Sequence, residues 1–100
     1  MAASRVRLHP GAERDVEEGL AFYLGRSPIA AERFLSELDA VLERIREAPV
    51  RWPRYRHGTR RCVLGVFPYS IVYRVVSDEI HVYAIAHARR RPFYWKKRRS

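Results

Sequence analysis

Cysteine is almost absent from this chain of 100 residues, which contains only Cys62. A single thiol excludes an intramolecular disulfide, a zinc site built from thiols and a CxxC redox pair. We therefore expect a reducing, cytoplasmic setting. A chain of this length is expected to form one domain over residues 1–100 and to bury enough surface to fold without cross-links.

Long hydrophobic runs are also missing. The stretch that ends at Arg7 has no apolar core of signal-peptide length, and no uncharged run approaches the roughly 18 residues needed to span a bilayer. We expect a soluble, unsecreted protein with no membrane partner.

The sequence offers little for binding a metal or a nucleotide. Its five glycines form no phosphate-cradling motif. The carboxylate pairs Glu13 with Glu17 and Glu43 with Glu47 have the spacing of solvated helix faces rather than of a ligand set. We expect no cofactor, no metal and no small-molecule substrate.

Acidic residues are scarce in the second half of the chain. Residues 48–100 carry 13 Lys and Arg against only Asp78 and Glu79, a balance of +11, whereas residues 1–47 carry seven Arg against nine Asp and Glu, a balance of −2. The net charge is +9. Cations concentrated beyond a boundary create a directional field that attracts polyanions and acidic partner segments, so the sequence predicts a charged partner.

The beginning of the chain predicts a strand followed by a helix. Polar and apolar side chains alternate over residues 5–8, and Pro10 and Gly11 are expected to end this strand. From 12 to 24 the apolar positions recur at helical spacing, which predicts an amphipathic helix closed by Gly25 in the left-handed conformation.

A second helix is predicted directly after the first. Ser27 supplies a capping hydroxyl, Pro28 suits the first helical position, and the apolar face continues to about Ala48. So short a connection predicts an antiparallel helix hairpin. Pro49 bars further helix, and the basic and aromatic stretch 49–59 is expected to be an irregular loop.

The rest of the chain is rich in strand-forming residues. Segments 61–67, 70–76 and 80–87 predict an antiparallel three-strand meander, whose apolar face needs the helix hairpin as a cover. The fold class expected is α+β, in the order β-α-α-β-β-β. The opening strand joins an antiparallel sheet, and a basic C-terminal tail follows.

The tail, residues 88–100, holds seven Lys and Arg together with Phe93, Tyr94 and Trp95. Such cations bind phosphates, while aromatic faces accept bases or stack on arginine. The alternative is a solubilising tail pinned to the domain by its aromatic residues, and both interpretations can hold at once. The cations that we assign to target or nucleic-acid binding are Arg61, Arg74, Arg89, Arg90, Arg91, Lys96, Lys97 and Arg98.

A catalytic role is the other hypothesis for this region. Cleavage of RNA without a metal needs a base, an acid and a cation to stabilise the phosphorane, and His87, Arg90 and Tyr94 supply those groups. His87 ends the last predicted strand, where an imidazole can titrate near neutral pH, but a hydrogen-bonded structural histidine fits equally. A surface that only binds RNA would offer the same residues.

The order of elements, together with four strings, resembles the RelE/ParE superfamily of bacterial toxins over nearly the whole chain. The strings are Ala12-Glu13-Arg14-Asp15-Val16, Arg60-Arg61-Cys62, Phe67-Pro68-Tyr69-Ser70-Ile71-Val72-Tyr73-Arg74-Val75 and Ile85-Ala86-His87-Ala88-Arg89-Arg90-Arg91-Pro92. The resemblance implies the toxin of a type II toxin-antitoxin module, neutralised by a cognate antitoxin whose C-terminal segment wraps the basic surface.

Within the superfamily, RelE-like members cleave messenger RNA on the ribosome and ParE-like members bind DNA gyrase. RelE-like nucleases place cations along the first meander strand and after the tyrosine that opens the next. Here those places hold the stretch 63–66, Val-Leu-Gly-Val, and Ser70 after Tyr69. Arg89 or Arg90 and Tyr94 do match the nuclease pattern.

The missing strand cations favour the ParE-like interpretation, with DNA gyrase as the target. Two alternatives stay open. One is a RelE-like, metal-independent messenger-RNA endoribonuclease acting on the ribosome, and the other is a nucleic-acid-binding module without toxicity.

Overall fold

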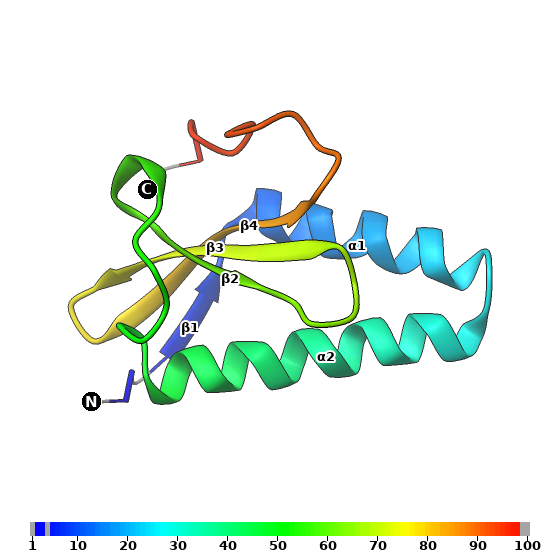
Figure 1. Cartoon of the computed structure of the whole chain (residues 1–100), viewed down its shortest axis with the longest axis horizontal. Coiled ribbons are helices and arrows are strands. Elements are labelled where there is room, and N and C mark those ends of the chain that lie inside the picture. The colour runs from blue at the N-terminus through cyan, green and yellow to red at the C-terminus, as the bar shows by residue number, and fades with distance from the viewer. Residues whose placement is uncertain (1, 4, 99–100) are drawn as a thin grey trace.

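The computed structural model describes residues 2–3 and 5–98, and its elements follow the predicted order (Figure 1). The predicted tail is thus described as far as residue 98, and its last two residues lie outside the described part. The elements are β1 (Arg5–Leu8), α1 (Pro10–Leu24), α2 (Pro28–Glu47), a 3₁₀ turn (Arg56–Gly58), β2 (Arg60–Val63), β3 (Tyr69–Val76) and β4 (Glu79–His87).

The four strands form one sheet in the order β1-β4-β3-β2. The meander β2-β3-β4 is antiparallel, as predicted, whereas β1 pairs with β4 in parallel, so the sheet is mixed rather than antiparallel throughout. The physical reason is the long connection through both helices and two strands, which leaves β1 free to align either way with β4. The α+β class and the element order are confirmed.

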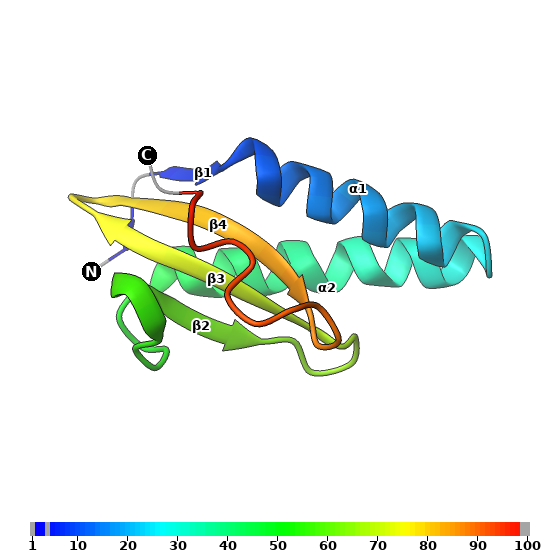
Figure 2. The same cartoon turned by 90° about the horizontal axis from the view of Figure 1, so that it is seen from above.

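The main core lies between the sheet and the helix hairpin. Figure 2 shows α1 and α2 running side by side, with the meander in front of α2. Phe34 and Ile45 of α2 and Ile71, Tyr73 and Ile80 of the sheet are completely buried in this core. At about 25 cal/mol per Å² of apolar area removed from water, such side chains supply most of the stabilisation.

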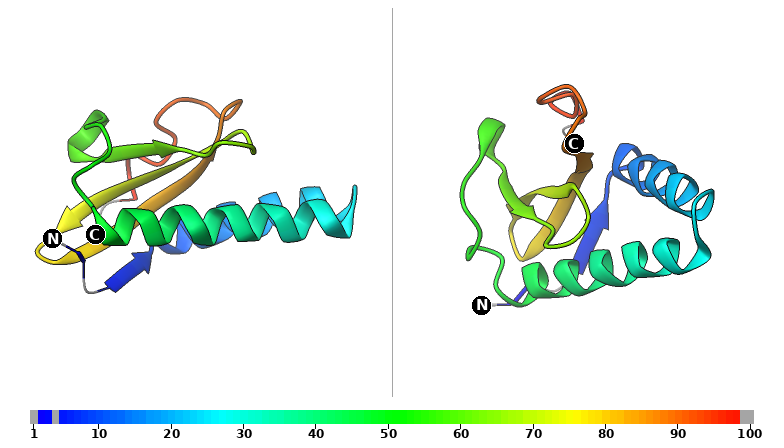
Figure 3. Two further views of the ribbon diagram at one scale, coloured as in Figure 1. Left: turned by 60° about the horizontal axis from the view of Figure 1, so that its bottom comes forward. Right: turned by 45° about the vertical axis from the view of Figure 1, so that its right-hand side comes forward.

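The tail crosses the other face of the sheet. Figures 2 and 3 show residues 88–98 as an irregular strap over β4 and β3, on the side away from α2. Trp95 is 3% exposed and packs on Val72 and Ala84, which point out of that face. The sheet is therefore covered on both faces, by helices on one and by the tail on the other.

Helix α1 begins at Pro10, two residues before the predicted start. Proline is favoured at the first helical position because its missing N–H has no partner there in any case. His9 acts as the cap, since its Nδ1 accepts the Gly11 N–H at 2.9 Å. The strand ends before Pro10 as predicted, but the predicted helix start at residue 12 was wrong, because histidine is not among the usual capping residues.

The hairpin connection differs in one detail. Gly25 has φ −66° and ψ −15°, so the expected left-handed closure of α1 is wrong. The chain makes a right-handed turn instead, and the N–H groups of Arg26 and Ser27 both bond to the Tyr23 carbonyl. Ser27 caps α2 as predicted, because its hydroxyl accepts the Ala30 N–H at 3.3 Å.

Strand β2 ends at Val63, four residues earlier than predicted. The N–H groups of Gly65, Val66 and Phe67 all turn toward Glu37 of α2, whose carboxylate accepts each of them at 3.1 Å. Three charge-assisted bonds replace the ladder bonds that a continued strand would have made. Glu37 therefore anchors the turn after β2 to α2.

Strand β4 carries one extra residue at its centre. Val72 pairs with Ala84 and Tyr73 with Val82, so Tyr83 has no partner residue on β3 and the register shifts there. A bulge of this kind leaves a backbone group without a ladder partner.

Neither helix in the described part of the chain is long and apolar enough to cross a membrane.

Candidate functional site

A buried carboxylate connects the tail to the body of the protein. Asp15 of α1 is 4% exposed, and its Oδ2 accepts three hydrogen bonds. The donors are the Ile85 N–H at 3.1 Å, the Tyr94 hydroxyl at 2.8 Å and Arg98 Nη1 at 2.7 Å. One side chain thus joins α1, β4 and the tail.

Arg98 is the strongest partner of Asp15. Besides this ion pair, its Nη1 donates to the Tyr83 carbonyl at 3.0 Å. Tyr83 is the residue that the bulge leaves without a ladder partner. The Arg98 side chain is only 15% exposed and covers Gly11, where an added Cβ would lie 2.5 Å from Arg98 Nε. Arg98, which we predicted to bind a target, thus holds the tail against α1 and β4.

Two further predicted site residues share this cluster. Arg90 lies 3.7 Å from Asp15 Oδ1 and 3.5 Å from Glu18 Oε1, and its guanidinium stacks 4.0 Å from the centre of the Tyr94 ring. Burial, reinforced by the nearby Asp15 carboxylate, raises the pKa of Tyr94 well above its ordinary value of 10.0. Tyr94 therefore stays protonated at neutral pH and donates its proton to Asp15.

The remaining catalytic candidate, His87, ends β4 as predicted. Its Nδ1 accepts the Arg89 N–H at 3.0 Å, and its ring meets Tyr69 edge-on at 5.0 Å. It lines a cavity of about 160 Å³ together with Arg90, Phe22 and Tyr69. His87 and Arg90 thus border one cavity, but Tyr94 does not line it.

Aromatic side chains fasten the tail to the basic loop. The rings of Phe93 and Trp95 pack against Tyr55 and His57 of the loop, with centroid distances of 5.7 to 6.1 Å. His57 and Phe93 both have left-handed φ values, of 59° and 60°, which few residues other than glycine adopt. Their mutual packing stabilises two unfavourable backbone conformations where tail and loop meet.

Exposed cations surround this aromatic contact. Arg61 stacks on the Tyr55 ring at 4.3 Å, and Arg56 lies 5.6 Å from the centre of Phe93. Arg74 projects from β3 on the same face as Val72. In the described part of the chain none of these arginines forms an ion pair. The exposed cations of this side, called the cationic face below, are Arg56, Arg61, Arg74, Arg89, Arg91, Lys96 and Lys97.

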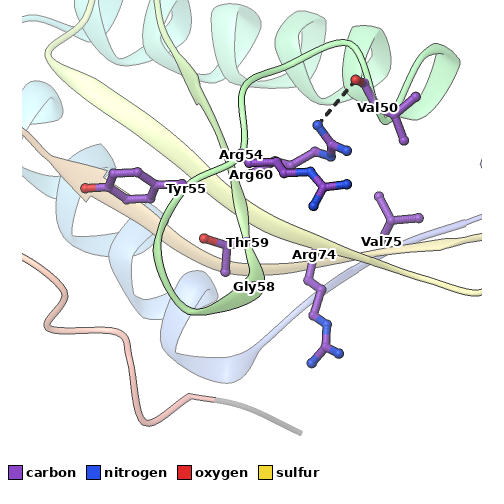
Figure 4. Close-up of a pocket in the computed structure, with 8 residues that line it drawn as sticks. All are labelled: Val50, Arg54, Tyr55, Gly58, Thr59, Arg60, Arg74 and Val75. Carbon is purple, nitrogen blue, oxygen red and sulfur yellow. Dashed lines mark hydrogen bonds between the residues drawn. The ribbon is translucent and has the colours of Figure 1, made fainter.

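A basic pocket lies where the loop meets the edge of the sheet (Figure 4). It has a volume of about 320 Å³ and contains three arginines, Arg54, Arg60 and Arg74, but no carboxylate. Figure 4 shows Arg54 and Arg60 side by side, while Arg74 points away from them. Arg60 donates to the Trp52 carbonyl at 2.7 Å. Arg54 and Arg60 are basic residues of the site that the sequence did not single out.

Comparison with known proteins agrees with this fold. The family described as "ParE toxin of type II toxin-antitoxin system, parDE" matches residues 6–92. The chain belongs to the ParE family. Toxin ParE2 of Mycobacterium tuberculosis, from strains H37Rv and CDC 1551, is 32% identical over 90 residues, which cover 88% of this chain and 85% of the relative.

A solved structure extends the ParE-family assignment to the fold. The structure titled "Chromosomal ParDE TA system from P. aeruginosa" superposes with a TM-score of 0.74 over 86% of this chain and 96% of the other, at 19% identity. This ParE-family protein is therefore a type II toxin by family, and the RelE/ParE resemblance of its sequence is confirmed.

The structure divides the predicted site residues of this ParE-family protein into two groups. Arg90, Tyr94 and Arg98 form contacts with Asp15, although Arg90 stays exposed, whereas the exposed residues Arg61, Arg74, Arg89, Arg91, Lys96 and Lys97 make no contact with Asp15. Asp15 was not recognised as a site residue. A signal existed, because the buried residues of α1 are Gly11, Ala12, Asp15 and Gly19, so Asp15 falls on the inward face of the helix.

Proposed function

We propose that this ParE-family toxin acts by binding DNA gyrase and inhibiting it, and that a cognate antitoxin neutralises it. The observation that carries the proposal is the engagement of Arg90, Tyr94 and Arg98 by Asp15. Groups held in a structural cluster position the tail, and the exposed cations around it are then available for a macromolecular partner.

The meander gives independent support for binding rather than cleavage. Val63 and Val66 are 62% and 81% exposed, and Ser70 follows Tyr69, so the places where RelE-like nucleases carry cations are apolar or neutral here. A single electrostatic contact to the transition state is worth about 10²-fold in rate, and several are missing. The protonated Tyr94 is also poorly suited to act as a general base.

Neutralisation by an acidic antitoxin segment follows from the charge distribution. The P. aeruginosa neighbour is titled as a ParDE system, and we propose a ParD-like partner here as well. The cationic face would accept acidic side chains of such a partner. Because exposed charges are screened beyond ~8 Å at physiological salt, the affinity for the antitoxin should fall as ionic strength rises. An affinity independent of salt would contradict this role of the face.

The target is tested by measuring gyrase supercoiling and messenger-RNA breakage in parallel with the same purified protein. We expect loss of supercoiling without breaks during in vitro translation. Arg89→Ala, on the cationic face, should weaken inhibition, and Arg33→Ala, an exposed arginine of α2, is the matched control.

The variant Tyr94→Phe distinguishes gyrase inhibition by binding from messenger-RNA cleavage. It keeps the aromatic packing and removes only the hydroxyl that donates to Asp15, so a gyrase inhibitor should stay active. Breaks in messenger RNA that disappear in Tyr94→Phe or Arg90→Ala would overturn the proposal in favour of a nuclease. Absence of both effects would leave only a nucleic-acid-binding module.

A further inference from the structure

We infer that the cationic face also binds the phosphate backbone of duplex DNA, and that this binding needs no second protein. The inference goes beyond the proposed function, since it concerns direct contact between the toxin and DNA. Its test contains no gyrase, so it can fail while the proposed function holds.

The cationic face carries positive charge without a compensating carboxylate. The seven cations of the face are all exposed, and in the described residues none has a carboxylate within ion-pairing distance. Some arginines elsewhere do have a counter-charge: Arg5 and Arg7 pair with Glu79, and the half-buried Arg46 pairs with Glu43. Cations that repel one another on a surface are stabilised by an anion that spans them, and a phosphate backbone is such an anion.

The cations of this face are held in place by their neighbours. Arg61 is stacked on Tyr55, Arg56 on Phe93, and the tail that carries Arg89, Arg91, Lys96 and Lys97 is held by Trp95 and by the Asp15 cluster. A strap that is already ordered loses little conformational entropy when it binds. The cations are thus presented in a fixed arrangement rather than on a flexible tail.

The aromatic side chains of this face favour a duplex over a single strand as its ligand. Proteins that bind single strands offer exposed aromatic faces on which bases stack. Here Trp95 is 3% exposed, and the rings of Tyr55, His57 and Phe93 are occupied by one another. Neither helix lies on this side of the sheet to enter a groove (Figure 3). The contacts would therefore be to phosphates, which position a protein without reading sequence.

The carboxylates on the opposite side of the molecule determine which side of the protein faces DNA. Glu13, Glu17, Glu32, Asp39 and Glu47 are exposed on α1 and α2, whereas the only carboxylates after residue 48, Asp78 and Glu79, lie at the turn between β3 and β4. DNA is therefore repelled from the helix layer and attracted to the strap. Arg74 belongs both to the cationic face and to the basic pocket of Figure 4, so the pocket extends the surface at the edge of the sheet.

The test is fluorescence anisotropy of the full chain with labelled duplex DNAs of two unrelated sequences, titrated at several salt concentrations. We expect equal affinity for both sequences and a linear fall of log K with log salt, with each phosphate contact contributing about 0.9 to the slope. The variant Arg74→Ala/Arg89→Ala/Arg91→Ala should bind at least about tenfold more weakly at low salt and show a slope shallower by about 2 to 3.

The matched control is Arg14→Ala/Arg33→Ala/Arg44→Ala, which removes the same charge from exposed positions of the helices. It should keep the wild-type slope, and circular dichroism should show that both variants melt as the wild type does. Equal weakening in the two triple variants would overturn the inference, because affinity would then follow net charge alone. So would tighter binding to single-stranded RNA than to duplex DNA, or no binding to DNA at low salt.

Discussion

At the scale of single residues, the sequence shows which groups are present but not which distant groups meet. Asp15 and Arg98 are 83 positions apart, and their ion pair depends on the path of the whole tail. Asp15 is also easily explained in another way, since acidic residues in the first turns of a helix stabilise its dipole. That explanation suits the exposed Glu13 but not a carboxylate that is 4% exposed. Among the described residues no buried side-chain polar atom lacks a hydrogen bond, so the cluster is fully satisfied.

Asp15→Asn should lower the free energy of unfolding by about 3 kcal/mol, because it leaves the nearly buried Arg98 guanidinium without its counter-charge. Urea denaturation measures this change. Glu17→Gln, an exposed carboxylate of the same helix, is the control and should change stability by less than about 0.5 kcal/mol. A similarly small effect of Asp15→Asn would mean that the cluster contributes nothing to the docking of the tail.

At the scale of elements, periodicity predicted the two helices and the meander, and it failed where side chains from other elements set the boundaries. The residues of β2 favour extended structure beyond Val63, yet Glu37 of α2 draws the following N–H groups away from the ladder. Propensity describes a segment alone, whereas this boundary depends on a carboxylate 28 to 30 residues earlier. The start of α1 was missed for a local reason, the unusual capping by His9.

Glu37→Gln should destabilise the turn after β2 and lower the free energy of unfolding by about 1 to 2 kcal/mol, because a neutral amide accepts hydrogen bonds less strongly than a carboxylate. Hydrogen exchange of the Val66 and Phe67 amides should become faster than in the wild type. Asp39→Asn, an exposed substitution on the same helix, is the control. Unchanged exchange at both amides would refute the anchoring role of Glu37.

The histidine cap of α1 should make the stability of the protein depend on pH in the acid range. Burial, followed by the charges of Arg98 and Arg14, lowers the pKa of His9 below 6.5, and Nδ1 must be unprotonated to accept the Gly11 N–H. As pH falls through 6.5, the unfolded chain takes up the proton first, so stability is lost. His9→Asn keeps a capping acceptor and should remove this part of the pH dependence, whereas His9→Ala should cost about 1 kcal/mol at neutral pH.

Melting curves of the three proteins across the acid range measure this effect. The difference between the wild type and His9→Asn is the relevant quantity, since it cancels the contributions of the other histidines. A pH dependence that is identical in the two proteins would show that the imidazole does not titrate with unfolding.

At the scale of the whole molecule, the charge split along the sequence became a split in space. The carboxylate-rich first half forms the helix layer, and the basic second half forms the meander, the loop and the strap. The sequence alone predicted one positively charged side. The two halves of the chain form different layers, so the charges of the two halves are separated in space. The sequence could not show that Arg90 and Arg98 pair with Asp15, nor that Arg98 is thereby largely buried, since both depend on tertiary packing.

Buried tyrosines predict a loss of stability in alkali. Burial raises the pKa of Tyr69 and of Tyr73 to about 12, whereas the unfolded chain releases these protons near 10.0. Between those values the unfolded state holds fewer protons, so the free energy of unfolding falls as pH rises. Absorbance of tyrosinate should show these late titrations, and Tyr73→Phe should remove one of them. Complete tyrosine ionisation near pH 10 with the fold intact would contradict the burial of these hydroxyls.

The separation of acidic helices from a basic strap also makes the molecule an electric dipole. In the field of a long polyanion such a body experiences a torque and turns its strap forward before contact. Fewer encounters then occur through the helix layer, which cannot bind. Association should therefore be faster than the molecule's size and net charge alone imply.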